Sequence, residues 1–187
     1  MSGGGSARLF AALDPPVEVG RELLRWARWA LRGAGERGPR LLEPESMHVT
    51  LMFLGERPFE EIDALGGALR AAAEGARACE LQTGAPIWLP PRRPRALAVE
   101  VHDEQGELVS VQRELAKALC AVAGLAVPRR FRAHLTLARA RSAPAAHEAL
   151  PPTPALRFTA EEVVLYRSHL EARAARYERV AAAPLAG

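Results

Sequence analysis

Apolar residues follow two different periods in the first part of the chain, and together they predict a strand, a helix, a second strand and a second helix. Residues 8–13 form a short apolar run typical of a strand, and the Asp-Pro-Pro after it is typical of a helix start. Apolar side chains then recur at helical spacing over residues 19–30, until glycines at 33–35 end the helix. A second strand is predicted over residues 47–54, and Pro58 begins a second helix.

The same order of elements begins again after a proline-rich connection at residues 86–94. Residues 96–101 predict a strand, and residues 108–122 carry a helical stripe that ends at Gly124. Residues 131–138 predict the next strand. The second half of the chain therefore repeats the strand-helix-strand order of the first half, which indicates an internal duplication.

The last part of the chain adds two strands to this pattern. A proline-rich spacer covers residues 151–154, and the runs at 162–168 and 177–180 predict two strands joined by a turn that complete one of the sheets. The whole pattern predicts an α+β fold of two similar lobes facing each other. We expect a single domain over residues 1–187, with a flexible N-terminus at residues 1–6.

The composition is that of an ordinary globular protein, and it narrows the expected location. Hydrophobic residues make up 49% and charged residues 25% of the chain, which argues against a disordered or fibrous protein. No apolar run approaches the roughly 20 residues of a membrane span, and the N-terminus lacks the pattern of a secretion signal. We therefore expect a cytoplasmic monomer that binds no membrane. Cys79 and Cys120 have no metal-type spacing and are expected to be reduced and buried.

Positive charge in this chain is carried almost entirely by arginine, because Lys117 is the only lysine. The net charge of +3 is too small for a polybasic binder that works by counterion release alone. The planar guanidinium group suits phosphate oxygens better than the lysine ammonium does, although a GC-rich coding bias explains the same preference. Two groups of arginines occur in the second half of the chain: Arg92, Arg93 and Arg95, and Arg129, Arg130 and Arg132.

One short motif occurs twice, at matching places in the two strand-helix-strand units. Residues 48–51 read His-Val-Thr-Leu, and residues 134–137 read His-Leu-Thr-Leu. The composition predicts roughly 0.02 copies of His-x-Thr-Leu by chance, so two copies indicate one composite site. Strand alternation places the histidine and threonine of each motif on one face, with Arg132 beside the second pair. The same alternation turns Phe53 to the opposite face with the apolar residues of the first motif.

These residue types fit in-line cleavage of a phosphodiester. One group must take a proton from the attacking water and another must give a proton to the departing ribose oxygen, and histidine suits both roles because its pKa is about 6.5. The threonine hydroxyls can donate hydrogen bonds to the non-bridging oxygens. A strained cyclic phosphate does not require a metal, and the chain has no His-Glu-x-x-His, paired cysteines, Gly-x-Ser-x-Gly or Walker motif. We therefore predict a metal-independent site that contains His48, Thr50, His134 and Thr136.

Other candidate residues have weaker support. A lone strand histidine is more often a hydrogen-bonded structural group than a catalytic one, so histidines outside the repeated motif are expected on the surface of loops or strands: His102, His147 and His169. Three aromatic residues are either stacking partners for a nucleobase or core residues, and the sequence does not choose between these roles: Phe53, Phe131 and Tyr166.

The motif-bearing segments resemble the two-histidine phosphoesterase superfamily and, within it, the bacterial and archaeal RNA 2′,3′-cyclic phosphodiesterases, also called 2′-5′ RNA ligases. The likeness extends over nearly the full length and includes the following segments: residues 8–14, 47–55, 131–139 and 165–168, with a later Tyr177. The resemblance implies two pseudo-symmetric lobes of antiparallel sheet, with helices on the outer faces and both motifs lining a central cleft.

The resemblance also implies an activity and a role for each site residue. The activity is hydrolysis of the 2′,3′-cyclic phosphate of RNA ends or nucleotides to a 2′-phosphomonoester, without a cofactor. His48 would give a proton to the leaving 3′ oxygen, and His134 would take a proton from water. Thr50 and Thr136 would bind the phosphate, with Arg139 adding positive charge. Strict alternation turns Arg139 away from this face, so it reaches the site only if the strand ends or bulges before it.

Two kinds of alternative remain open. The same chemistry could serve another small cyclic phosphate or a 2′-5′ linkage, including the reverse ligation. The arginines that flank the second motif also fit a non-catalytic module that binds RNA ends in the same cleft.

Overall fold

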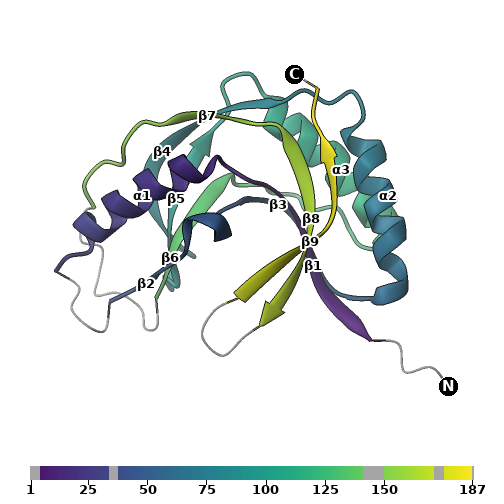
Figure 1. Cartoon of the computed structure of the whole chain (residues 1–187), viewed down its shortest axis with the longest axis horizontal. Helices are drawn as coiled ribbons and strands as arrows, with labels where there is room; N and C mark the ends of the chain where they lie inside the picture. The colour runs from purple at the N-terminus through teal and green to yellow at the C-terminus, as the bar shows by residue number, and fades with distance from the viewer. Residues whose placement is uncertain (1–4, 34–37, 141–149, 171–174, 187) are drawn as a thin grey trace.

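The computed structural model describes residues 5–33, 38–140, 150–170 and 175–186, in which three α-helices and nine strands are found (Figure 1). The helices are α1 (Val17–Ala30), α2 (Ile62–Ala73) and α3 (Glu107–Ala123). The strands are β1 (Ser6–Leu13), β2 (Arg40–Leu41), β3 (Val49–Pro58), β4 (Cys79–Leu89), β5 (Ala96–His102), β6 (His134–Arg139), β7 (Arg157–Ala160), β8 (Glu162–Leu170) and β9 (Ala175–Pro184). No helix in these ranges is both long enough and apolar enough to cross a membrane.

Parts of three predictions fall on residues that the structure does not describe. Residues 1–4 of the predicted flexible terminus, Gly35 after the first helix and His147 all lie outside the described ranges. β1 begins at Ser6, so the predicted flexible terminus is wrong at this residue.

The strands form one curled sheet made of two halves. Their order is β7-β4-β5-β6-β3-β1-β8-β9, β2 pairs with the outer part of β6, and every pairing between these strands is antiparallel. The halves meet at β3 and β6, where the register consists of the single pair Val49 and Leu135. The predicted α+β fold with two lobes of antiparallel sheet is confirmed (Figure 1).

The two faces of the sheet carry different sets of buried residues. Along β1, alternate side chains such as Leu9 and Leu13 join the main core, where all three helices bury their apolar stripes. The residues between them, Phe10 and Ala12, belong to a small second cluster with Tyr166 on the other face. The helices therefore stabilise one face of the sheet, and the other face is left to form a site.

The ends of α3 follow the signals that the sequence carries. Asp103 accepts hydrogen bonds from the backbone N–H groups of Gly106 (3.0 Å) and Val109 (3.3 Å), which are otherwise unpaired at a helix start. The helix ends at Gly124, whose φ of 65° is the left-handed conformation that glycine adopts most readily. This is the helix end that the sequence predicted.

The proline-rich connection predicted at residues 86–94 is wrong in its first half. β4 continues to Leu89 and keeps pairing with β5, so that Pro86 lies opposite Val99. The other neighbour of β4, β7, pairs with it only from Cys79 to Gln82. Pro86 therefore lies in a part of β4 that has one neighbouring strand, where a residue without an N–H group is tolerated.

Candidate active site

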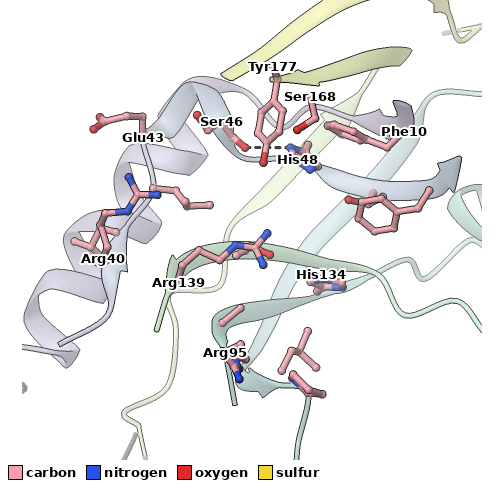
Figure 2. Close-up of a pocket in the computed structure, with 18 of the residues that line it drawn as sticks. Phe10, Arg40, Glu43, Ser46, His48, Arg95, His134, Arg139, Ser168 and Tyr177 are labelled. Carbon is pink, nitrogen blue, oxygen red and sulfur yellow. Dashed lines mark hydrogen bonds between the residues drawn. The ribbon is translucent and has the colours of Figure 1, made fainter. Parts of the chain in front are cut away.

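A cleft of about 760 Å³ lies on the face of the sheet that carries Phe10, away from the main core. All five residues predicted to form the site line this one cleft: His48, Thr50, His134, Thr136 and Arg139. Figure 2 shows the two histidines on two sides of the cleft, with the guanidinium group of Arg139 directed toward the space between them. Residues that are far apart in the sequence are thus brought together by the pairing of β3 with β6.

The two motifs are related by the antiparallel pairing of their strands. Counting outward from the pair Val49 and Leu135, the histidine of each motif is level with the threonine of the other motif. An imidazole from one half of the sheet therefore lies across the cleft from a hydroxyl of the other half. This arrangement gives the cleft an approximate twofold symmetry.

Each histidine ring is held by the same local hydrogen bond. The Nδ1 atom of His48 lies 3.0 Å from the carbonyl oxygen of Ser46, and the Nδ1 atom of His134 lies 2.8 Å from the carbonyl oxygen of Arg132. A carbonyl oxygen can only accept, so Nδ1 is the donor in both rings. In a neutral ring the other nitrogen, Nε2, is then free to accept a proton.

A bulge in β3 changes which side chains reach the cleft. Two successive residues of β1 pair with Thr50 and Met52, so Leu51 is an extra residue in β3. Leu51 and Met52 are both buried in the main core, and the alternation is shifted by one residue beyond them. Phe53 consequently lines the cleft with 62% of its surface exposed. Our prediction that Phe53 faces away from the histidine was wrong, because it assumed an unbroken strand.

β6 has a bulge at the equivalent position. Two successive residues of β5 pair with Thr136 and Ala138, which leaves Leu137 as the extra residue. Leu137 and Ala138 are both buried, so Arg139 returns to the face of Thr136 and lines the cleft. The bulge on which the prediction for Arg139 depended is therefore present.

The surroundings of His48 are aromatic. Its ring centroid lies 4.8 Å from that of Phe10 and 5.1 Å from that of Tyr177, which meets it edge-on. Tyr166 lies behind them, is buried, and donates a hydrogen bond from its hydroxyl to the Asp14 carboxylate. Of the three aromatic candidates for base stacking, Tyr166 thus belongs to a core and Phe53 faces the cleft. The third, Phe131, packs against the main core.

Burial controls the charge of His48. Its pKa is lowered to about 4, chiefly by desolvation and to a smaller extent by the positive charges of Arg139 and His134. The hydrogen bond to the Ser46 carbonyl acts in the opposite direction but is weaker. The free protein therefore holds His48 neutral at pH 7.

Acid is expected to destabilise the protein through His48. A histidine in the unfolded chain has a pKa of about 6.5, so between that value and about 4 the unfolded state binds more protons than the folded state. The free energy of unfolding should therefore fall as the pH falls through this window. Between pH 7 and about pH 4.5, the free energy of unfolding of the wild type should fall by about 2 kcal/mol more than that of a His48→Gln variant. This figure allows for solvent screening of a half-buried ring. Urea unfolding of both proteins at the two pH values measures this difference.

The matched control for this comparison is His102→Gln, which changes a histidine whose side chain is exposed. That variant should keep the pH dependence of the wild type. An equal loss of stability in the wild type and in His48→Gln would show that His48 is not held neutral by burial.

The sequence matches the 2′-5′ RNA ligase superfamily over residues 15–172, which is most of the chain. The chain belongs to this superfamily. Two relatives named RNA 2′,3′-cyclic phosphodiesterase support the assignment. One, from Geobacillus stearothermophilus, is 32% identical over 148 residues, which are 76% of this chain and 46% of that protein. The other, from Thermus thermophilus, is 34% identical over 181 residues, which are 91% of this chain and 86% of that protein.

This chain thus spans less than half of the Geobacillus relative but most of the Thermus relative. Both names agree with the prediction of an enzyme of this class.

Two solved structures share the fold of this chain. A protein of Thermus thermophilus has a TM-score of 0.79 with 24% identity, and the match covers 96% of this chain and 98% of that one. E. coli LigT in complex with 3′-AMP has a TM-score of 0.74 with 24% identity, again over 96% and 98% of the two chains. At 24% identity these two likenesses establish the fold of this chain alone.

Several cleft residues were not singled out from the sequence. Arg40 lies in β2, which has only two residues and therefore no periodic pattern, and Arg95 was noted only as one of a group. Ser46 lies in the turn before the first motif. The feature of the sequence that could have indicated it is its position two residues before His48, whose ring binds its carbonyl oxygen. Tyr177 was part of the family resemblance but had no assigned role.

The remaining histidines and cysteines of the described ranges lie elsewhere. His102 and His169 do not line the cleft, and the Nε2 atom of His169 lies 2.6 Å from a carboxylate oxygen of Glu178. Cys79 and Cys120 are both free and buried, as the sequence predicted. Among the described residues, no three His, Cys, Asp or Glu side chains gather into a possible metal-binding group.

Proposed function

We propose that this protein hydrolyses 2′,3′-cyclic phosphate ends of RNA to 2′-phosphomonoesters by general acid and base catalysis, without a metal. The observation that carries the proposal is the pair of equivalent histidines that line one cleft from two halves of the sheet. Each ring uses Nδ1 to bind a backbone carbonyl and has Nε2 left for proton transfer. The names of the two relatives supply the substrate class.

The reaction requires one proton transfer at each histidine. The Nε2 atom of His134 takes a proton from water as the water oxygen forms a bond to phosphorus. The bond from phosphorus to the 3′ oxygen breaks, and the Nε2 atom of His48 gives that oxygen a proton. The products are a 2′-phosphomonoester and a 3′ hydroxyl, and the two histidines have exchanged protonation states.

His48 must therefore gain a proton before it acts as the acid. In the free protein it is neutral, because burial and the nearby positive charges lower its pKa to about 4. A bound cyclic phosphate carries a negative charge, and a nearby opposite charge favours the protonated ring. Binding of the substrate thus raises the pKa of His48 and loads the acid only when the reacting group is present.

The remaining cleft residues would stabilise charge on the phosphate. Thr50 and Thr136 offer one hydroxyl from each half of the sheet, level with the two histidines. Arg139 offers a guanidinium group that carries a permanent positive charge and several N–H donors. Donors placed around the non-bridging oxygens stabilise the charge that develops in the five-coordinate geometry.

Turnover of a 2′,3′-cyclic mononucleotide or dinucleotide should continue at an unchanged rate in excess EDTA, and the product should be only the 2′-phosphomonoester. Liquid chromatography against 2′- and 3′-phosphate standards measures both properties, and dialysis of the protein against chelator before the assay removes a tightly bound ion. Loss of activity that returns on adding a divalent metal would identify a metalloenzyme. Binding of RNA ends without any turnover would identify a non-catalytic module.

A further inference from the structure

Three arginines form a row at the end of the cleft beyond His48 and Thr136. Arg40 of β2 pairs across the strands with Arg139 of β6, which in turn pairs with Ala96 of β5. Arg95 immediately precedes Ala96, and its backbone is fixed by hydrogen bonds to Leu89 and Ala140. All three side chains line the cleft (Figure 2).

This row carries positive charge that the described part of the protein does not neutralise. None of the three guanidinium groups forms an ion pair or hydrogen bond with an acidic side chain in the described ranges, and Glu43 is the only carboxylate among the residues found to line the cleft. Like charges placed directly opposite across a strand pair are destabilising. The cross-strand pair of Arg40 and Arg139 is therefore a local cost that a bound anion would relieve.

The reacting phosphate alone does not account for this row. Thr136 and Arg139 pair with Ala98 and Ala96, which are two residues of strand or roughly 7 Å apart. Arg40 lies at the level of Arg139, and Arg95 lies one residue beyond it. Arg139 is directed back toward the histidines (Figure 2). Arg40 and Arg95 are left for a second anion, at a distance comparable with that between neighbouring phosphates of a nucleic-acid strand.

The opposite end of the cleft has a different character. Phe53 occupies there the position that is equivalent to Arg139, because each follows the bulge of its motif by two residues. The fourth arginine of the described cleft, Arg8, belongs to this end, and it differs from the row in having Glu56 directly across the strands. Three of the four arginines that line the described cleft thus lie at the end formed by β2, β5 and β6.

We propose that Arg40 and Arg95 form a second phosphate subsite, which binds the phosphodiester on the 5′ side of the nucleotide that carries the cyclic phosphate. The substrate class is then the end of an RNA strand and not a free cyclic mononucleotide. This inference rests on the proposed function, because it takes the position of the reacting phosphate from the two histidines. Guanidinium groups suit such a phosphate because they donate two parallel hydrogen bonds to its oxygens.

The test compares a dinucleotide that ends in a 2′,3′-cyclic phosphate with the corresponding cyclic mononucleotide, with and without a 5′-phosphate. The wild type should hydrolyse the dinucleotide with a kcat/KM at least about tenfold above that of the mononucleotide without a 5′-phosphate. Arg40→Gln and Arg95→Gln should each lower the value for the dinucleotide by about tenfold and leave that mononucleotide within about twofold. Arg93→Gln is the matched control, since Arg93 is exposed in the same turn as Arg95 but does not line the cleft.

Three results would overturn the subsite. The first is equal turnover of mononucleotide and dinucleotide by the wild type. The second is a preference for the dinucleotide that survives in both variants. The third is a preference of the wild type for the 5′-phosphorylated mononucleotide alone. The last would assign the subsite to a free nucleotide. Affinity for a dinucleotide with a 2′-phosphate, measured by fluorescence anisotropy, gives a readout that needs no turnover. Loss of that affinity in the variants together with an inactive wild type would contradict the proposed reaction and support the subsite.

Discussion

Replacing His134 or His48 with alanine is expected to lower kcat/KM for a 2′,3′-cyclic phosphate by about a hundredfold to ten-thousandfold, the usual contribution of a positioned acid or base. Both rings line the cleft, and each has one nitrogen committed to a backbone carbonyl and the other available for the substrate. Water is a poor substitute for either ring, because it has no pKa near neutrality. Steady-state kinetics on the purified variants measures the loss.

The two variants should differ when the leaving oxygen is replaced by sulfur. A 3′-thiolate is a better leaving group than an alkoxide and needs no proton, so His48→Ala should recover much of its lost activity on a 2′-O,3′-S-cyclic substrate. His134→Ala should lose as much activity on this substrate as on the ordinary one, because the attacking water still needs a base. The opposite pattern would reverse the two assignments.

Stability of the variants decides whether the loss of activity is chemical. Neither histidine belongs to the main core, and both are partly exposed, so their thermal unfolding should stay near that of the wild type at neutral pH. His102→Ala is the control on the surface, because its side chain is exposed and lies outside the cleft. Nearly full activity in either cleft variant would remove the basis of the proposed reaction.

Replacing Leu135 with alanine is expected to lower the free energy of unfolding by about 2–5 kcal/mol, the range found when a buried leucine is truncated. Leu135 has no exposed surface, and it pairs with Val49 on one side and Val99 on the other. It is therefore the residue at which the two halves of the sheet meet. Chemical denaturation measured by circular dichroism gives the change.

Truncation of Leu135 should also affect catalysis, since it lies between the two site residues of its motif. We expect a loss of kcat/KM in addition to the loss of stability, because the distance between the two histidines depends on this joint. Val109→Ala is the matched control: Val109 lies on α3 with 45% of its surface exposed and should change stability by less than about 0.5 kcal/mol. A change of that small size at Leu135 would mean that the halves are joined mainly elsewhere.

The meeting of His48 and His134 at one cleft could be predicted because their motif is repeated. His48 and His134 lie at matching places in two units with the same order of elements, and simple strand alternation already grouped each with its threonine. Strand alternation gave the wrong face for Phe53, because it assumes an unbroken strand and β3 has a bulge at Leu51. A bulge is set by the pairing with β1, which is a contact between distant segments and has no signature in the local pattern.

The arginine row was missed for a related reason. Arg40 lies in a two-residue strand that pairs with the end of β6 and is too short for any local periodicity to mark it. Arg95 comes from a proline-rich turn that we interpreted as a plain connection, although β4 extends into its first half. Both residues acquire a role only when strands β2, β5 and β6 are side by side, which no stretch of sequence encodes alone.

The matched bulges have a consequence for which bond of the proposed substrate is broken. A site with perfect twofold symmetry would accept a cyclic phosphate in two orientations related by a half-turn, and it would release the 2′ and 3′ regioisomers equally. The bulges bring an unequal pair of side chains, Phe53 and Arg139, to equivalent positions on the shared face. This unequal pair gives the proposed site a direction, and the proposed regioselectivity follows from it without any change to the histidines or threonines.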